Sequence, residues 1–206
     1  HTVLGIFSNI RALGLPLVSD EIYDGLVYDG ARVTSALELC DDAYVLDGFS
    51  KRYAMTGFRL GYAISPKPAA RALQVMQQNL FISANHFVQR AGIAALREGA
   101  ATVAAMRAAY APRRELLVSG LRRLGLRVPV LPQGAFYVFA DASAFGRDSL
   151  ALAFEILERA HVGTTPGIDF GAEGEGFLRF CYAAPEARLR EALERLARVL
   201  PTLARG

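Results

Sequence analysis

The stretch that decides the fold runs Phe49-Ser50-Lys51-Arg52-Tyr53-Ala54-Met55-Thr56-Gly57-Phe58-Arg59-Leu60-Gly61-Tyr62, and it places an amine, a hydroxyl and a guanidinium beside glycines. Only two of the 23 basic residues of the chain are lysines, Lys51 and Lys67. Arginine keeps its proton near neutral pH, whereas a lysine amine can lose it and then attack a carbonyl carbon. Lys67 lies between two prolines and is expected in an exposed turn. The sequence therefore singles out Lys51 as a candidate catalytic amine.

The composition is that of a soluble globular protein. The 206 residues are 52% hydrophobic and 21% charged, and charged side chains interrupt each apolar stretch well before the roughly 20 residues that a membrane span needs. The formal net charge is only +3, with arginines spread along the chain, which argues against a nucleic-acid partner. Cys40, Cys181 and the three histidines lack the spacing of a metal site. We therefore expect a cytoplasmic protein with reduced thiols and no membrane, nucleic-acid or metal partner.

The sequence around Lys51 predicts strands that alternate with helices. Strands are expected at residues 15–19 and 43–47, each ending in a polar loop, and a third strand is expected at residues 60–65. A helix over residues 1–14 precedes them. Such strands are typical of a parallel α/β sheet, in which ligands bind at the carboxyl ends. We expect residues 1–97 to form this domain.

A second, smaller domain of the α+β type is expected over residues 98–206. It begins with a long helix predicted at residues 100–124, in which Pro112 should produce a kink or a break. Apolar residues at helical spacing predict the final helix of the chain. The other predicted elements are strands at residues 126–130, 135–140 and 177–182, a helix at residues 150–160, and the final helix carrying Leu189, Leu193, Leu196 and Leu200.

Polar side chains follow the first predicted strand. Asp20 and Tyr23 lie three residues apart, so a carboxylate could hold a proton on a ring nitrogen while a phenol bonds a ring oxygen. The alternative is structural, with Asp20 as a capping residue and Tyr23 at the edge of the core. Lys51 follows the next strand, so we expect the carboxylate, the phenol and the amine to converge on one crevice.

Two arginines are candidate ligands for anions. Arg59 lies in a glycine-flanked segment and could pair with a phosphate, or it could form a surface ion pair. Arg179 lies among apolar residues of a predicted strand, where a buried guanidinium needs an anionic partner. That partner is either an internal Asp or Glu or a substrate carboxylate. Residues 132–137 and 166–171 contain Pro and Gly and are expected as shaped loops near Arg179.

These motifs, taken in order along the chain, resemble the class I/II aminotransferases, which are fold type I pyridoxal-phosphate enzymes. The resemblance implies amino-group exchange between an amino acid and a 2-oxo acid, in amino-acid metabolism, with pyridoxal 5′-phosphate as cofactor. It also implies that Lys51 is the catalytic residue, which forms a Schiff base with the cofactor and moves the substrate proton. The other implied roles are pairing with the pyridine nitrogen for Asp20, bonding of the phenolic oxygen for Tyr23, phosphate binding for Arg59, and binding of the substrate α-carboxylate for Arg179.

The chain departs from the family pattern in two ways. Many relatives have a serine as a phosphate ligand three residues before the lysine, where this chain has Gly48, and Ser50 is the candidate that replaces it. Relatives are also about twice as long, which implies that this chain is a truncated form equivalent to the carboxyl-terminal half. The expected fold is then an incomplete parallel-sheet large domain followed by a small α+β domain. Because relatives are homodimers, the full-length form is expected to be a homodimer.

The resemblance leaves other functions open. The same lysine chemistry serves lyases, decarboxylases and synthases of this fold. The aminotransferase scaffold also occurs as the effector domain of transcriptional regulators, in which a DNA-binding helix-turn-helix precedes it. A further alternative is an inactive fragment that binds no cofactor. The sequence upstream of His1 would distinguish these possibilities.

Overall fold

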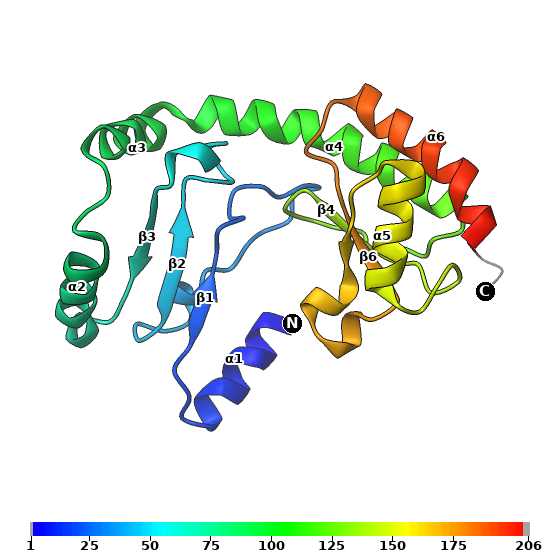
Figure 1. Cartoon of the computed structure of the whole chain (residues 1–206). Coiled ribbons are helices and arrows are strands. Elements are labelled where there is room, and N and C mark those ends of the chain that lie inside the picture. Colours follow the sequence, from blue (N-terminus) through cyan, green and yellow to red (C-terminus); the bar gives the residue numbers. More distant parts are fainter. Residues whose placement is uncertain (1, 204–206) are drawn as a thin grey trace. The chain divides into compact units, whose positions relative to one another are not determined.

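The computed structural model describes residues 2–203, and it divides the chain into two compact units, His1–Ala105 and Met106–Gly206. The boundary falls inside the long helix α4 (Ala100–Arg123), which is labelled in Figure 1. The division expected after residue 97 stays a prediction. Each unit has its own three-stranded sheet.

The sheet of the first unit has the order β1-β2-β3, with β1 at Val18–Asp20, β2 at Tyr44–Gly48 and β3 at Gly61–Ile64 (Figure 1). β1 and β2 are parallel, whereas β3 is antiparallel to β2. The sequence did not predict the direction of β3. A parallel neighbour needs a crossover that is usually an α-helix, whereas residues 49–60 between β2 and β3 form turns and one short 3-10 helix. The carboxyl ends of β1 and β2 therefore meet at the same edge of the sheet.

Three helices complete the first unit. α1 (Thr2–Ala12) ends shortly before Gly14, whose φ of +64° is a left-handed conformation that suits glycine. α2 (Lys67–Phe81) has a proline in its first turn, and α3 (His86–Glu98) begins where Asn85 accepts a hydrogen bond from the Phe87 amide. Leu73, Met76 and Leu80 of α2 have helical spacing but are exposed, with Leu80 at 67%.

α3 packs closely on the segment that follows β2. A Cβ atom placed on Gly92 would lie 2.6 Å from Leu60 Cδ2 and 3.3 Å from the Phe49 ring, so this close approach favours a glycine. Phe49 and Val88 are buried at this contact. A separate small core is formed by Ala36, Ala43 and Val45. The contact of Phe49 with α3 thus holds the start of the segment that carries Lys51.

Pro112 does not break α4, whereas the kink expected as the other effect of this proline stays a prediction. The helix continues from Ala100 to Arg123 with the proline inside it. A mid-helix proline removes one backbone hydrogen bond, but burial of the following apolar residues stabilises the helix on its far side. Leu117, Val118 and Leu121 are each at most 3% exposed.

The second unit has an antiparallel sheet of order β4-β6-β5, with β4 at Tyr137–Asp141, β6 at Phe177–Cys181 and β5 at Thr165–Pro166. The strand expected at residues 126–130 is wrong, since only an isolated bridge joins Arg127 to Asp141. Pro129 cannot donate to a sheet ladder, which ends the pairing there. Helices α5 (Ser149–Ala160) and α6 (Glu186–Leu203) complete the unit. Short 3-10 turns lie at η1 (Ala36–Glu38), η2 (Thr56–Phe58), η3 (Gly167–Phe170) and η4 (Ala172–Gly174).

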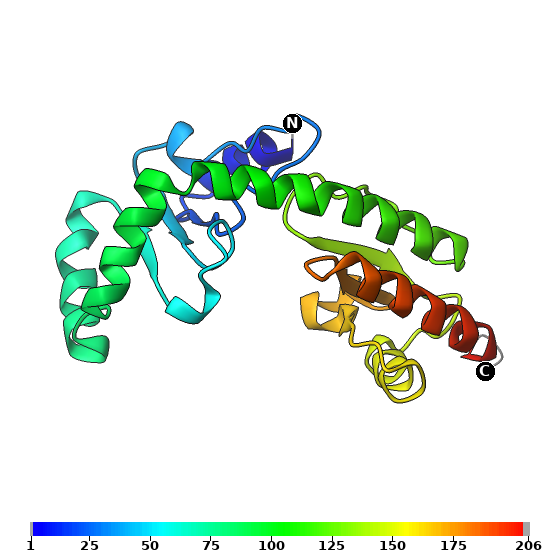
Figure 2. The ribbon, with the colours of Figure 1, turned by 90° about the horizontal axis from the view of Figure 1, so that it is seen from above.

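Side chains alternate across this sheet, as the period of two along a strand requires. One face is the buried core, and the other carries Arg179. Figure 2 shows α4 and α6 running side by side, and Leu193 approaches α4 so closely that a Cβ on Gly120 would lie 2.4 Å from it. The leucines predicted for the final helix are buried, as expected. The buried residues are Val138, Ala140, Leu178 and Phe180 on the strands and Leu189, Leu193, Leu196 and Leu200 on α6.

Candidate functional site

Lys51, Tyr23 and Asp20 lie at the same edge of the first sheet. Asp20 is the last residue of β1, where it pairs in register with Leu46 of the parallel strand β2. Lys51 lies in the turn directly after β2 and is half-buried. Its Nζ atom is 6.0 Å from the centroid of the Tyr23 ring. The structure therefore brings together the carboxylate, the phenol and the amine that the sequence singled out.

Asp20 has a structural contact that leaves part of its carboxylate available. Its Oδ1 atom accepts a hydrogen bond of 3.2 Å from the Ile22 amide, and since residues 22–25 form a turn, this is a turn contact and not the helix cap considered as the alternative role. Within residues 2–203 this is the contact that Asp20 makes, and its side chain is exposed. The Oδ2 atom can therefore accept a hydrogen bond from a ligand while Oδ1 accepts the bond from the Ile22 amide.

Hydrogen bonds fold the segment after Lys51 back on itself. The Thr56 hydroxyl donates to the Ser50 carbonyl at 3.0 Å, and the Arg59 Nη1 atom donates to the Thr56 carbonyl at 2.8 Å. Arg59 has a φ of 53°, a left-handed conformation that is uncommon for a residue with a side chain. Such strained positions cluster at ligand sites. The arrangement brings Ser50 and Arg59 together through Thr56.

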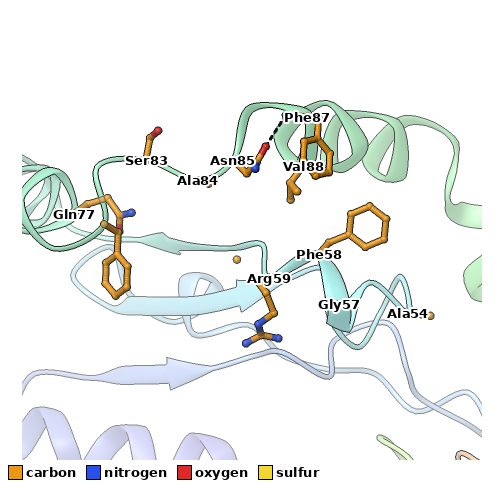
Figure 3. A pocket seen from close by; sticks show the side chains of 12 residues that line it. Ala54, Gly57, Phe58, Arg59, Gln77, Ser83, Ala84, Asn85, Phe87 and Val88 are labelled. Atoms are coloured by element: carbon orange, nitrogen blue, oxygen red, sulfur yellow. Dashed lines mark hydrogen bonds between the residues drawn. The ribbon is translucent and has the colours of Figure 1, made fainter.

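Arg59 also borders a pocket of about 850 Å³. The pocket lies between the segment around η2 and the connection from α2 to α3, as Figure 3 shows. Arg59 is the charged residue of its lining, which otherwise consists of small, amide and aromatic side chains such as Asn85 and Phe87. Asp20, Tyr23 and Lys51 do not line it.

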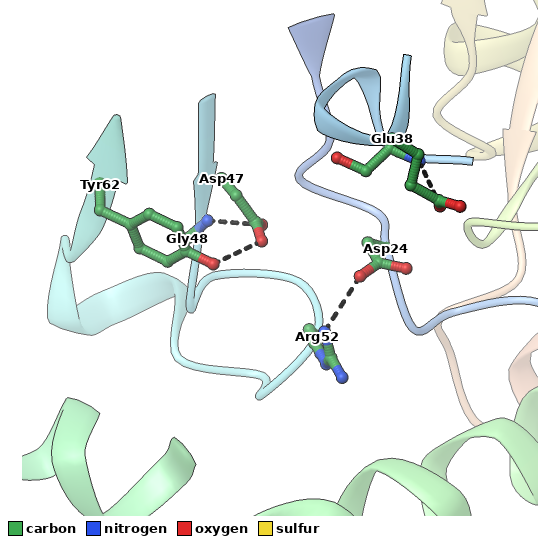
Figure 4. A network of polar contacts seen from close by, with 7 residues as sticks. Asp24, Glu38, Asp47, Gly48, Arg52 and Tyr62 are labelled. Atoms are coloured by element: carbon green, nitrogen blue, oxygen red, sulfur yellow. Dashed lines mark hydrogen bonds and ion pairs between the residues drawn. The ribbon is translucent and has the colours of Figure 1, made fainter. Parts of the chain in front are cut away.

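An ion pair that the sequence did not predict joins the two loops of the site. Arg52, next to Lys51, pairs with Asp24 at 3.1 Å (Figure 4). Gly25 makes the approach possible, because a Cβ there would lie 2.8 Å from Arg52 Nε and its φ is +81°. The pair holds the lysine turn against the segment that carries Tyr23.

The fold leaves little room for a side chain at Gly48. The residue is buried at the end of β2, opposite Gly61 of β3. A Cβ on Gly48 would lie 3.0 Å from both the Gly61 Cα and the Leu60 carbonyl oxygen. The close approach of the two strands thus disfavours a side chain at position 48 and leaves Ser50 as the nearby hydroxyl.

Tyr62 and Asp47 form a second polar contact, with 2.7 Å between the phenol oxygen and the carboxylate (Figure 4). Burial and this hydrogen bond raise the pKa of Tyr62 to about 12. The raised pKa means that the contact stabilises the fold fully below the ordinary tyrosine pKa and that this stabilisation is lost as the pH rises toward 12.

We expect Asp47→Ala to return the pKa of Tyr62 toward its ordinary value, because the acceptor of the phenol proton is removed. Absorbance titration of tyrosinate should show one tyrosine fewer in the most basic step. Tyr62→Phe, which deletes the titrating group, should remove the same step. An unchanged titration in both variants would mean that Tyr62 does not have the raised pKa.

Arg179 of the second unit has no carboxylate partner within residues 2–203. Its Nη2 atom donates to the Thr165 hydroxyl at 3.2 Å, and its Cζ lies 4.3 Å from the centroid of the Tyr137 ring and 4.9 Å from that of Phe170. Tyr137 and Phe170 belong to the two loop segments expected near this arginine. Thr165 was not singled out from the sequence, because its position opposite Arg179 depends on the strand register. Two aromatic rings and a hydroxyl, and not the internal Asp or Glu considered from the sequence, therefore contact the Arg179 guanidinium.

A known family model matches nearly the whole chain. The family model described as aminotransferase class I and II matches residues 2–196. The chain belongs to the class I and II aminotransferase family. The resemblance in the motifs is confirmed, and so is the α/β fold.

Several aminotransferases are similar to this chain over part of their length. The valine–pyruvate aminotransferase of Mycobacterium tuberculosis is 42% identical over 189 residues, which are 90% of this chain and 49% of that protein. The aspartate/prephenate aminotransferase of Thermus thermophilus is 41% identical over 187 residues, which are 89% of this chain and 48% of that protein. The chain spans about half the length of these aminotransferases.

Solved aminotransferase structures have the same fold. The crystal structure of the aromatic aminotransferase from Pyrococcus horikoshii superimposes with a TM-score of 0.91 at 35% identity, covering 96% of this chain and 54% of that chain. An aminotransferase from Mycobacterium tuberculosis gives a TM-score of 0.87 at 41% identity, covering 95% of this chain and 51% of that chain. In the described part of the chain, no helix has the length and apolar character needed to cross a membrane. The same residues contain no cluster of three or more His, Cys, Asp or Glu side chains placed to bind a metal.

Proposed function

We propose that this chain carries the catalytic lysine of a pyridoxal-phosphate-dependent aminotransferase, which exchanges an amino group between an amino acid and a 2-oxo acid. The observation that carries the proposal is the position of Lys51 Nζ, 6.0 Å from the Tyr23 ring and at the sheet edge where β1 delivers Asp20. The proposal extends to a cytoplasmic homodimer acting on small molecules, because the family resemblance implies it.

The set of side chains fits the cofactor chemically. Bound pyridoxal 5′-phosphate supplies an aldehyde carbon and a pyridine ring that withdraws electrons. The Oδ2 atom of Asp20 would hold a proton on the ring nitrogen, because an adjacent carboxylate favours the protonated form of that nitrogen. The Tyr23 hydroxyl can donate to the ring oxygen. These two residues follow the same strand, so the fold sets their separation.

Lys51 performs the proton transfer in this proposal. Its Nζ atom, when uncharged, can condense with a carbonyl carbon with loss of water. Once the substrate amine has displaced it from that carbon, the freed Nζ atom can take the proton from the substrate Cα and return it. Arginine could not replace it, because its guanidinium does not lose a proton in this pH range. The Arg52–Asp24 pair holds the turn that presents the amine.

Arg59 and Ser50 are the proposed ligands of the cofactor phosphate, and Arg179 is the proposed ligand of the substrate carboxylate. Arg59 makes one contact to the Thr56 carbonyl, and its other donors can bind phosphate oxygens together with the Ser50 hydroxyl. Arg179, which lacks an ion-pair partner in the described chain, is available to the α-carboxylate of the amino acid. Both assignments use guanidinium groups whose planar donors match oxyanions.

A difference spectrum tests the proposed function. Addition of pyridoxal 5′-phosphate to the complete protein should give a visible absorption band that differs from that of the dissolved cofactor. The band should disappear in Lys51→Ala and remain in Lys67→Ala, because Lys67 lies at the exposed start of α2. The same band in all three proteins would refute the assignment of Lys51.

Arg179→Gln is expected to weaken amino-acid binding by about 30-fold, since a hydrogen bond to a charged group contributes about 2 kcal/mol. Cofactor affinity should change little. Titrations of the holoenzyme with an amino acid and of the apoprotein with the cofactor separate the two effects. Equal losses in both titrations would instead indicate a structural arginine.

A further inference from the structure

The uncovered face of the second sheet holds Arg179 in a row of side chains from three strands. Arg179 on the central strand β6 lies opposite Phe139 of β4 on one side and opposite Thr165 of β5 on the other. Tyr137 lies two residues before Phe139 and so projects from the same face. Phe139 exposes 37% of its surface and Phe170 exposes 50%. Aromatic rings therefore surround the guanidinium on a face that the helices do not cover.

The Arg179 guanidinium lies against two aromatic rings and keeps donors for an anion. Its Cζ atom lies over the Tyr137 ring at 4.3 Å and over the Phe170 ring at 4.9 Å from the centroids, which is the range of cation–π contacts. The N–H groups of a guanidinium lie in its plane, and one of them already donates to Thr165. The in-plane donors of a guanidinium match the geometry of a bidentate carboxylate.

A pocket of about 470 Å³ adjoins this guanidinium. Three of its lining residues precede β4, namely Pro129, Val130 and Pro132, and the others are the rings of Tyr137, Phe139 and Phe170. Among its lining residues, all of which belong to the described part of the chain, Arg179 is the one cation. A ligand held by Arg179 through one carboxylate therefore has apolar surface for the rest of its length.

A buried arginine holds the wall of this pocket in place. Arg114 on α4 is 3% exposed, and its Nη1 atom donates to the Pro132 carbonyl at 2.9 Å. Hydrogen bonds from charged donors are among the stronger ones in proteins. The segment that carries Val130 and Pro132 is thus fixed before any ligand binds.

We propose that this pocket receives the substrate side chain and that the substrate is an amino acid with an uncharged, apolar side chain. The inference rests on the proposed function, in which Arg179 binds the α-carboxylate. An apolar side chain gains from burial against the rings and Val130. A second carboxylate would lose its hydration without meeting a cation in this lining, which is unfavourable.

Binding of two non-reactive acids to the complete protein tests the inference. 4-Methylpentanoate carries one carboxylate and a branched apolar tail, whereas glutarate has a similar length and a second carboxylate. Isothermal titration calorimetry should show that 4-methylpentanoate binds at least about tenfold more tightly, which equals about 1.4 kcal/mol. Arg179→Gln should weaken the binding of both acids.

Each outcome separates the inference from the function on which it rests. Equal or tighter binding of glutarate, with both acids still sensitive to Arg179→Gln, would overturn the substrate class and leave Arg179 as the carboxylate ligand. Binding that is insensitive to Arg179→Gln would overturn the role of the arginine itself. Binding of neither acid would show that the pocket is not a substrate subsite.

A charge placed in the wall should reverse the preference. Val130 exposes 73% of its surface, so a lysine there is compatible with folding. Val130→Lys should tighten glutarate binding by about threefold, the effect of one partly exposed ion pair, and should weaken 4-methylpentanoate binding. Leu150→Lys is the matched control, because Leu150 is 48% exposed on α5 and does not line this pocket. An equal change in both variants would mean that net charge and not the pocket sets the affinity.

Discussion

Lys51→Arg is expected to lower the rate of amino transfer by about 10⁴-fold or more, the upper range for loss of a general acid–base group. The substitution keeps the positive charge and a similar side-chain length, so a purely electrostatic role of Lys51 would survive it. The proton-transfer role cannot survive, because a guanidinium stays protonated. Steady-state kinetics of the complete protein with an amino acid and a 2-oxo acid measure the loss.

Lys67→Arg is the control for this experiment, since the chain contains only these two lysines. Lys67 lies at the start of α2 and is exposed, so arginine there should leave the rate unchanged. Similar rates for Lys51→Arg and the unmodified protein would show that the amine of Lys51 takes no part in the reaction.

Gly167→Ala is expected to lower the free energy of unfolding by about 3 kcal/mol or more, because overpacking against backbone cannot be relieved by a rotamer change. A Cβ on Gly167 would lie 1.8 Å from the Gly174 carbonyl oxygen and 2.7 Å from that of Phe177. The substitution must displace the turn that carries Phe170 beside Arg179. Urea-induced unfolding, followed by circular dichroism, measures the change.

Gly163→Ala provides the matched control, since no atom lies within 4 Å of a Cβ at that position. It should change the free energy of unfolding by less than about 1 kcal/mol. Equal stabilities of the Gly167 and Gly163 variants would contradict the close contact between residues 167 and 174.

The position of the amine and the carboxylate could be predicted because it depends on a general property of parallel strands. Asp20 ends β1 and Lys51 follows β2, and parallel neighbours end at one edge of a sheet. The direction of β3 could not be predicted in the same way, because an apolar strand has the same pattern in either direction. The failed strand at residues 126–130 illustrates a second limit, since its apolar residues favour a strand but Pro129 cannot donate to a sheet ladder.

Arg179 itself could be predicted as a site residue, but its contacts could not. The residue itself stood out, because a guanidinium in an apolar strand needs an anion. Its contact to Thr165 depends on the register between β5 and β6, and no local pattern encodes that register. Helix α2 shows that the burial of a side chain also cannot be predicted from a local pattern. Leu73 and Leu80 have helical spacing, but the spacing alone does not say what covers them.

Borohydride reduction of the complete protein with bound pyridoxal 5′-phosphate shows which amine binds the cofactor, because it makes the link between cofactor and protein permanent. Peptide mapping by mass spectrometry then locates the pyridoxyl group. We expect one label per chain, on Lys51. A label on Lys67, or a protein that acquires no label while the cofactor is bound, would contradict it.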